Sequence, residues 1–279
     1  MSIKTDSLVI IFILLLVFSF GCQKMERERF DEKLETKIEF NPIIEHVGDD
    51  DVQISVHLES NIGQPSAKLF YQIDNVLSDP VNLAPLGENL FGYTVPAQDR
   101  GTRMNYYLEI TTATGTKIYF PRNAPEEEKF YTLTFKGKAN GLLLFIHVLL
   151  MVIPMILFIA AAYFAFKHLQ QQLPVDKTLW LSVIAFLLFF IGIVPFGMIV
   201  EYQVFGSIFQ GWPFGRDVTD TKTLVIFIYW FVSLMMMKNK IFKKEEKNLI
   251  SDKGFASLVV IGTIITLGMY LVPHENIRF

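Results

Sequence analysis

The sequence has a single cysteine, Cys22, among its 279 residues. An intrachain disulfide is therefore excluded, and so is a metal cluster held by several thiolates. The sequence also lacks a phosphate-binding glycine loop, a His-Glu-x-x-His zinc motif, a Gly-x-Ser-x-Gly nucleophile motif and a Cys-x-x-Cys-His haem attachment site. These absences argue against hydrolytic chemistry and favour a protein that is not an enzyme.

Basic residues do not form a stripe with interleaved aromatic residues, so the sequence predicts no binding to nucleic acid. The one lysine-rich stretch, residues 238–247, is interrupted by Glu245 and Glu246. The net charge of -3 at pH 7 sums over two different environments and indicates no particular partner.

Long apolar runs, in contrast, fill the second half of the chain. They cover residues 142–166, 179–200, 223–237 and 255–272. A helix needs about 20 mostly apolar residues to cross the hydrocarbon core of a bilayer. The first two runs meet that length, and the third does so by including polar neighbours. Residues 141–279 are therefore predicted to form an all-α, four-helix transmembrane bundle, with the lipid bilayer as its first partner.

The lysines of the loops predict the orientation. The segment between the third and fourth runs holds Lys238, Lys240, Lys243, Lys244, Lys247 and Lys253. By the positive-inside rule this segment is cytoplasmic. Counting back along the chain, residues 167–178 are cytoplasmic, residues 201–222 are external, and residues 23–140 lie on the extracytoplasmic side of a bacterial cytoplasmic (inner) membrane.

The amino-terminal segment, residues 1–22, has the pattern of an export signal. Lys4 precedes an apolar core from Leu8 to Phe20, which is too short for a spanning helix and suits a signal peptide. The core ends in Ser19-Phe20-Gly21-Cys22, which resembles a bacterial lipobox. That resemblance implies cleavage and lipidation of Cys22, and the alternative is an uncleaved signal anchor. Both alternatives give the same orientation.

Residues 23–36 are mostly charged and predict a tether. From residue 37 to residue 136 short β-type runs alternate with turn residues. Apolar Val52, Ile54 and Val56 alternate with polar neighbours, as in a strand with one buried face. The expected strands are Lys37–Phe40, Val52–Leu58, Ala67–Ile73, Val81–Leu83, Leu90–Val95, Asn105–Thr112, Lys117–Phe120 and Phe130–Phe135. This density of strands predicts an all-β sandwich.

The stretch from Phe91 to Pro121 sharpens the fold class. It contains Phe-Gly-Tyr-Thr-Val-Pro-Ala, a Gly101-Thr102 turn, Asn-Tyr-Tyr-Leu-Glu-Ile, a Thr114-Gly115 turn and Lys-Ile-Tyr-Phe-Pro. This pattern resembles bacterial immunoglobulin-like (Ig-like) or fibronectin type III-like modules. The resemblance implies a domain that binds other proteins or holds them in position, and it implies no chemistry.

One histidine, His147, lies within the first apolar run, and an ionisable group at membrane depth marks a candidate site. The run reads His-Val-Leu-Leu-Met-Val-Ile-Pro, which weakly resembles the first helix of cytochrome b561-like proteins. That resemblance implies ligation of haem b by His147. The topology places His274 on the same side and allows it as a second ligand. The alternative for His147 is a hydrogen bond to another helix.

The external loop contains Gln-Gly-Trp-Pro-Phe-Gly-Arg-Asp-Val-Thr-Asp from residue 210. Its aromatic residues, among them Trp212, suit a re-entrant or interfacial segment. Asp217 and Asp220, three residues apart, could coordinate a cation, and the external Glu201 also allows a metal site of histidine and carboxylate ligands. Capping of the third span by Asp217 or Thr219 explains the two aspartates more simply. Arg216 could bind a carboxylate, or it could form an ion pair with these acids.

Two hypotheses follow. The first is a non-enzymatic membrane protein whose external Ig-like domain binds or positions membrane or periplasmic proteins, as a subunit or accessory of a complex. The second is a small membrane electron-transfer protein that holds haem b through His147.

Overall fold

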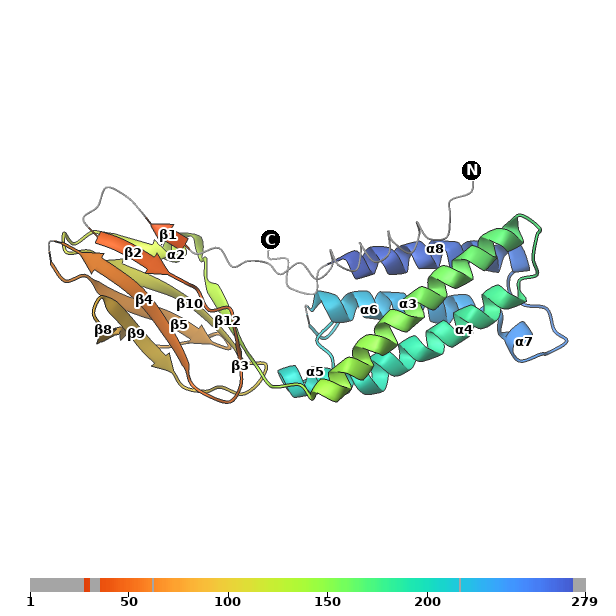
Figure 1. Cartoon of the computed structure of the whole chain (residues 1–279), viewed down its shortest axis with the longest axis horizontal. Coiled ribbons are helices and arrows are strands. Elements are labelled where there is room, and N and C mark those ends of the chain that lie inside the picture. Colours follow the sequence, from red (N-terminus) through yellow and green to blue (C-terminus); the bar gives the residue numbers. More distant parts are fainter. Residues whose placement is uncertain (1–27, 31–35, 62, 216, 273–279) are drawn as a thin grey trace. The chain divides into compact units, whose positions relative to one another are not determined.

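The computed structural model describes residues 28–30, 36–61, 63–215 and 217–272. This part of the chain divides into two compact units (Figure 1). One unit is built of β-strands and comprises the described residues from Glu28 to Lys138 together with Gln203–Gly206, and the other unit is helical. The expected fold class, a β domain followed by a bundle of four apolar helices, is confirmed.

The β unit is a sandwich of two sheets. The first sheet has the strand order β1-β2-β4-β9-β8. Its strands are β1 (Glu28–Phe30), β2 (Thr36–Phe40), β4 (Val52–Ser60), β8 (Ala84–Gly87) and β9 (Leu90–Val95). The second sheet has the order β3-β12-β10-β5-β6, with β11 paired to β10 and β7 paired to β5. Its strands are β3 (Glu45–Val47), β5 (Ser66–Ile73), β6 (Val76–Leu77), β7 (Val81–Asn82), β10 (Arg103–Thr111), β11 (Lys117–Phe120) and β12 (Tyr131–Lys136).

The inward faces of the two sheets form one hydrophobic core. In β4 the alternation works as predicted, because Ile54, Val56 and Leu58 are buried while intervening residues are not. Complete burial of such a side chain stabilises the fold by roughly 1.5–3 kcal/mol. In β10 the inward residue Tyr106 also carries polar contacts: its hydroxyl accepts the N–H of Ile43 at 2.8 Å and donates to the carbonyl oxygen of Ile43 at 3.1 Å.

All eight expected strands are present, and β1, β3, β6 and β8 are additional. These four lie at the ends of the two sheet orders. Each is two to four residues long, which is too short to show an alternating pattern in the sequence. The stretch from Pro121 to Glu128 contains the short helix α2 (Ala124–Glu127).

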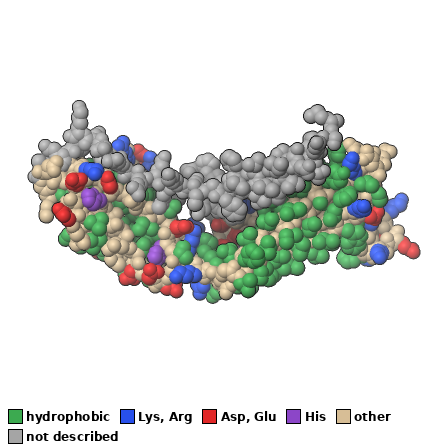
Figure 2. All heavy atoms as spheres, in the orientation of Figure 1, with side chains coloured by type: hydrophobic (Ala, Val, Ile, Leu, Met, Phe, Trp, Pro, Cys, Tyr) green, Lys and Arg blue, Asp and Glu red, His purple; other side chains and the backbone are tan. Residues whose placement is uncertain are grey.

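Among the described residues of the helical unit, four helices are long and apolar enough to cross a membrane, so the protein is a multi-pass membrane protein. The spans are α3 (Gly141–Leu169), the continuous run α4 (Asp176–Ile191), η1 (Gly192–Gly197) and α5 (Met198–Phe205), then α6 (Val218–Met235) and α8 (Asp252–Leu271). A short helix, α7 (Lys238–Ile241), lies between α6 and α8. On the face of the bundle that Figure 2 shows, hydrophobic side chains cover the helices and charged side chains gather at the end that carries α7.

The loop expected at residues 201–222 is shorter than predicted. Helix α5 continues to Phe205 and α6 already begins at Val218. The polar start of α6 is compatible with a helix because its side chains bond to the backbone one turn earlier. The hydroxyl of Thr221 donates to the carbonyl oxygen of Asp217 at 2.7 Å, and that of Thr223 donates to Thr219 at 2.8 Å.

The interior of the bundle is centred on Trp230 of α6, which is fully buried. Its ring stacks on Phe158 of α3, with the centroids 3.9 Å apart, and its indole N–H donates to the hydroxyl of Thr266 on α8 at 2.9 Å. The hydroxyl of Tyr270 on α8 donates to the carbonyl oxygen of Met151 on α3 at 3.0 Å. A buried indole N–H or phenol hydroxyl needs a hydrogen-bond partner. Here each of these two hydrogen bonds joins one helix to another.

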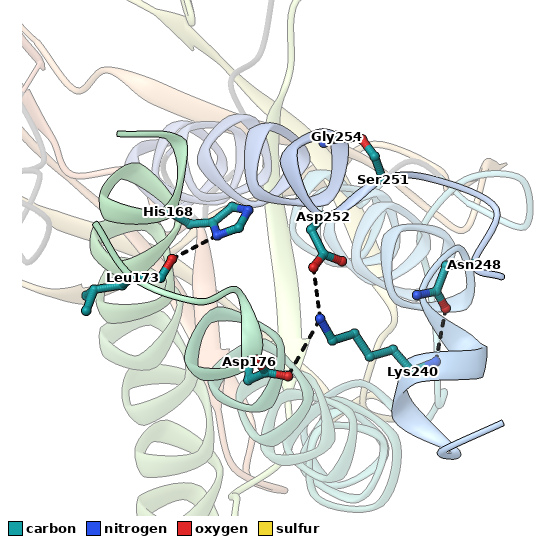
Figure 3. A network of polar contacts seen from close by, with 8 residues as sticks. All are labelled: His168, Leu173, Asp176, Lys240, Asn248, Ser251, Asp252 and Gly254. Carbon is teal, nitrogen blue, oxygen red and sulfur yellow. Dashed lines mark hydrogen bonds and ion pairs between the residues drawn. The ribbon is translucent and has the colours of Figure 1, made fainter. Parts of the chain in front are cut away.

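A network of polar contacts closes the α7 end of the bundle (Figure 3). The Nζ of Lys240 lies 2.9 Å from Oδ2 of Asp252 and 3.6 Å from Oδ1 of Asp176. The backbone N–H of Lys240 donates to Oδ1 of Asn248 at 3.0 Å. Both aspartates lie in the first turn of a spanning helix, where the helix dipole favours negative charge. One lysine therefore links the starts of α4 and α8.

Candidate functional site

The outer face of the seven-stranded sheet carries the candidate site, and β10 is its centre. Met104, Tyr106 and Leu108 point into the core, so Tyr107 and Glu109 point outward. In the strand register, Tyr107 lies opposite Phe70 of β5, and Glu109 lies opposite Lys68 of β5 and Tyr119 of β11. Three strands thus bring aromatic and charged side chains together on one face.

Four aromatic rings form a cluster around Tyr107. The ring of Phe70 stacks on Tyr107 with the centroids 4.7 Å apart. Tyr119 meets Tyr107 edge to face at 6.3 Å, and Phe130, which precedes β12, lies at 6.0 Å. All four residues are half-buried. We call these four residues, Phe70, Tyr107, Tyr119 and Phe130, the Tyr107 patch.

A buried carboxylate adjoins the patch. Glu109 is 7% exposed, and its Oε2 accepts a hydrogen bond from Lys117 Nζ at 3.1 Å and from the Tyr119 hydroxyl at 3.1 Å. The hydrogen bond to Glu109 raises the pKa of Lys117. Burial, and then the hydrogen bond to Glu109, raise the pKa of Tyr119. Burial, followed by the charge of Glu109, raises the pKa of Tyr107.

Polar side chains surround the rings. Lys68 and Lys117 are exposed beside Glu109, and the hydroxyl of Thr132 donates to Oδ1 of Asn105 at 2.5 Å on the other side of Tyr107. Binding interfaces combine an aromatic centre of Tyr, Trp and Phe with a polar rim. The outer face of a sheet is ordinarily polar, so an aromatic cluster on this face is unusual and marks a candidate binding surface.

The arrangement of the rings bears on what the patch can bind. Phe70, on β5, covers one side of the Tyr107 ring, while Tyr119 and Phe130 lie on the side of β11 and β12. The central ring therefore offers its edge and its hydroxyl rather than an open face. Ring edges and a hydroxyl group are features against which other side chains can pack and form hydrogen bonds.

Sequence reasoning did not single out this patch. Both residues of the pair Tyr106-Tyr107 are aromatic, so alternation does not say which of them is outward. Phe70, Tyr119 and Phe130 read equally well as core residues of their own strands. The sequence did show that a strand with Tyr-Leu-Glu is followed by a strand with Lys-Ile-Tyr-Phe. Only the pairing register of these two strands, however, places Tyr119 next to Glu109.

His147 forms a hydrogen bond to another helix, which was one of its two predicted roles. Its Nδ1–H donates to the carbonyl oxygen of Gly192 in η1 at 3.0 Å. Gly197 lies close by, since a Cβ there would be 3.3 Å from Cε1 of His147. The other histidine among the described spans, His168, lies at the opposite end of α3. Haem ligation by His147 stays a prediction, which reduced and oxidised visible spectra of the protein and of His147→Ala would check.

The acidic residues of the outer loop accept hydrogen bonds from backbone N–H groups of the loop and of α6. Asp217 is the N-cap of α6, as predicted, and its Oδ1 accepts the N–H of Asp220 at 3.0 Å. Asp220 Oδ2 accepts the N–H of Gln210 at 2.6 Å. Glu201 lies within electrostatic range of both aspartates. Within the described ranges, no three His, Cys, Asp or Glu side chains are grouped as metal ligands.

The remaining predicted positions, Cys22, Arg216 and His274, lie outside the described residues. One ionisable residue in a span was missed by sequence reasoning. Lys222 is 7% exposed, and its Nζ donates to the carbonyl oxygen of Val272 at 2.7 Å. The lysine of α6 thereby binds the end of α8, where the helix dipole favours a cation.

The chain matches no known protein family and no curated protein.

Proposed function

We propose that this protein is a non-enzymatic subunit or accessory of a membrane complex, and that its Ig-like domain binds a protein partner through the Tyr107 patch. The supporting observation is the cluster of four half-buried aromatic rings on the outer face of a sheet, next to a buried Glu109. Aromatic rings on this face also stabilise the sheet as cross-strand pairs, but a cluster of four on a face that is ordinarily polar marks an interaction surface.

The four spans hold the domain at a membrane surface. The lysines around α7 support an orientation in which that end of the bundle is cytoplasmic. Because α3 follows the β unit directly and has its other end near α7, the β unit then belongs to the extracytoplasmic side. We infer a bacterial cytoplasmic membrane, and the signal-like segment ending at Cys22 supports the same orientation.

The patch is already arranged for binding. Strand pairing fixes Phe70 and Tyr107, and the bond to Glu109 fixes Tyr119. Rings whose positions are set in advance lose little conformational entropy when a partner covers them. Truncation of an aromatic hot-spot residue at the centre of an interface costs about 2 kcal/mol or more of binding free energy, which is at least about 30-fold in affinity.

Site-specific crosslinking in cells would test the proposal. A photo-reactive amino acid replaces Lys68, which is exposed beside the patch, in the full-length protein. We expect one discrete adduct that is lost on Tyr107→Ala and kept on Tyr107→Phe. The same amino acid at exposed Gln53, on β4 of the other sheet, is the control and should give no such adduct. Equal adducts from both positions, or insensitivity to Tyr107→Ala, would contradict the proposal.

A further inference from the structure

The loop between α5 and α6 projects large aromatic side chains although its backbone is firmly held. Trp212 is 68% exposed, Phe214 is 85% exposed and Ile208 is 59% exposed. Phe214 makes an edge-to-face contact with Phe209 at 6.3 Å. Exposed aromatic residues on a backbone held by hydrogen bonds indicate a site that contacts a membrane or another molecule.

Hydrogen bonds attach this loop to itself and to the first turn of α6. Besides the bond from Gln210 to Asp220, the N–H of Trp212 donates to the hydroxyl of Thr221 at 2.9 Å, and the N–H of Asp217 donates to the carbonyl oxygen of Gln210 at 2.9 Å. The N–H groups of Phe214 and Gly215 both donate to the carbonyl oxygen of Gly211 at 2.9 Å.

Gly211 is required where the loop approaches α6. A Cβ at this position would lie 2.7 Å from the Cβ of Asp220 and 2.8 Å from the backbone nitrogen of Thr221. The polar side chains at the start of α6 therefore accept hydrogen bonds from the loop backbone. The aromatic side chains of the loop then point away from α6.

The loop continues the lipid-facing surface of the spans. It follows α5, where Ile199 and Tyr202 are exposed, and precedes α6, where Val225 and Ile228 are exposed on the sides of the bundle. It lies at the end of the bundle opposite α7, since one span separates the two connections. Trp and Tyr prefer the interface between hydrocarbon and headgroups, and Trp and Phe form the buried face of interfacial segments.

We infer that Trp212 and Phe214 form a wedge that inserts into the lipid headgroup and upper acyl-chain region of the bilayer. Asp220 is a positioning residue for this wedge, through its bond to Gln210. The depth is shallow, because Thr219, Asp220 and Thr221 are polar residues that favour the headgroup level over the hydrocarbon core. The bilayer itself, rather than a protein, is thus the partner of this loop.

Tryptophan fluorescence of the full-length protein in phosphatidylcholine vesicles would test the inference. The chain has three tryptophans, and Trp230 is fully buried. Trp180→Phe removes the other exposed indole, and the pair Trp180→Phe and Trp180→Phe/Trp212→Phe gives the signal of Trp212 by difference. We expect brominated phosphatidylcholine to quench this difference signal, most strongly when the bromine lies near the carbonyl end of the acyl chain, and aqueous iodide to quench it weakly.

Three results would overturn the inference. Strong quenching by iodide without quenching by bromolipid would place Trp212 in water. Quenching by neither reagent would place it under protein. Strongest quenching by bromine near the methyl end would mean a deeply re-entrant loop.

A variant pair tests the positioning role of Asp220. Asp220→Ala should lower bromolipid quenching of Trp212 by at least about half, because the loop loses the hydrogen bond that joins Gln210 to α6. Asp220→Asn keeps an acceptor oxygen and should restore most of the quenching. Equal quenching in both variants would overturn the role of Asp220 while leaving the wedge itself to the lipid measurement.

Discussion

The ring of Phe70 lies nearly parallel to the ring of Tyr107, with an angle of 4° between their planes and 4.7 Å between their centroids. The two residues are direct partners across β5 and β10 on the outer face of the sheet. This pair stabilises the sheet locally and also builds the centre of the Tyr107 patch, so its two roles need separate measurements.

Phe70→Ala should lower the free energy of unfolding of the β unit by about 1 kcal/mol, the scale of one cross-strand aromatic pair. Phe70→Tyr keeps the stacked ring and should change stability little. Hydrogen exchange of the β5 and β10 amides in the full-length protein, read by mass spectrometry, reports this local stability. Unchanged exchange in Phe70→Ala would show that the pair contributes nothing to the sheet.

Adjacent tyrosines on opposite faces give a matched pair of substitutions. Tyr106→Phe removes the hydroxyl that bonds both to the N–H and to the carbonyl oxygen of Ile43. Because these groups are partly buried, the loss should destabilise the β unit by roughly 1–3 kcal/mol. Tyr107→Phe removes a hydroxyl on the outer face and should have little effect. Denaturant unfolding of both variants checks the difference, and equal losses would contradict it.

Alkaline pH should weaken the β unit through the contacts around Glu109. The folded-state pKa of Lys117 is raised above its ordinary value of 10.5, and that of Tyr119 above 10.0. The folded state therefore keeps these protons where the unfolded state loses them. Their stabilisation is fully present below about pH 10 and is lost as the pH rises through the folded-state pKa values.

The unfolding temperature, measured from pH 8 to pH 11.5 (an interval chosen to bracket these values), should fall at the upper end. The fall should be smaller in Glu109→Gln, which removes the charge that Lys117 needs. Glu127→Gln is the control: the hydrogen bond to Lys129 lowers the pKa of Glu127, so that contribution is lost in acid rather than in alkali. An alkaline fall identical in the native protein and Glu109→Gln would refute the role of Glu109.

Particular residues show what the sequence could and could not predict. The long apolar runs predicted the four spans, because a helix in lipid needs a continuous apolar sequence. The alternation in β4 predicted a half-buried strand, because burial of one face of a sheet gives a two-residue pattern. Asp217 as the cap of α6 was also predictable, since capping depends on neighbouring residues. The Tyr107 patch was not, because it depends on the register of three strands. Lys222 was overlooked because the polar start of α6 read as a loop.

Lys240 should contribute through two ion pairs of unequal strength. Its Nζ is 2.9 Å from Asp252 and 3.6 Å from Asp176, and its side chain is only 27% exposed. In double-mutant cycles of the full-length protein in detergent, Lys240→Met with Asp252→Asn should give a coupling of up to about 1 kcal/mol. The cycle with Asp176→Asn should give less, and both couplings should shrink as salt is raised. Equal couplings for the two aspartates would contradict the geometry.

Two glycines of α8 should respond differently to the same substitution. A Cβ at Gly262 would lie 2.3 Å from Cε1 of Tyr229 and 3.2 Å from Cζ2 of Trp230, whereas a Cβ at Gly268 would meet nothing within 4 Å. Tyr229 cannot move freely, because its hydroxyl donates to the carbonyl oxygen of Leu258 at 2.7 Å, and Trp230 is fixed between Phe158 and Thr266. The α6–α8 contact at Gly262 thus depends on the missing side chain, as small residues allow close packing of membrane helices.

Gly262→Ala should therefore destabilise the bundle by about 1–3 kcal/mol, the usual cost of overpacking. Gly268→Ala should leave stability unchanged or raise it slightly, because alanine is the better helix former. Thermal unfolding of the two variants in the same detergent, followed by the fluorescence of buried Trp230, separates the two effects. If Gly268→Ala proved as damaging as Gly262→Ala, the loss would come from the helix backbone, and the close contact between Gly262 and Tyr229 would not explain it.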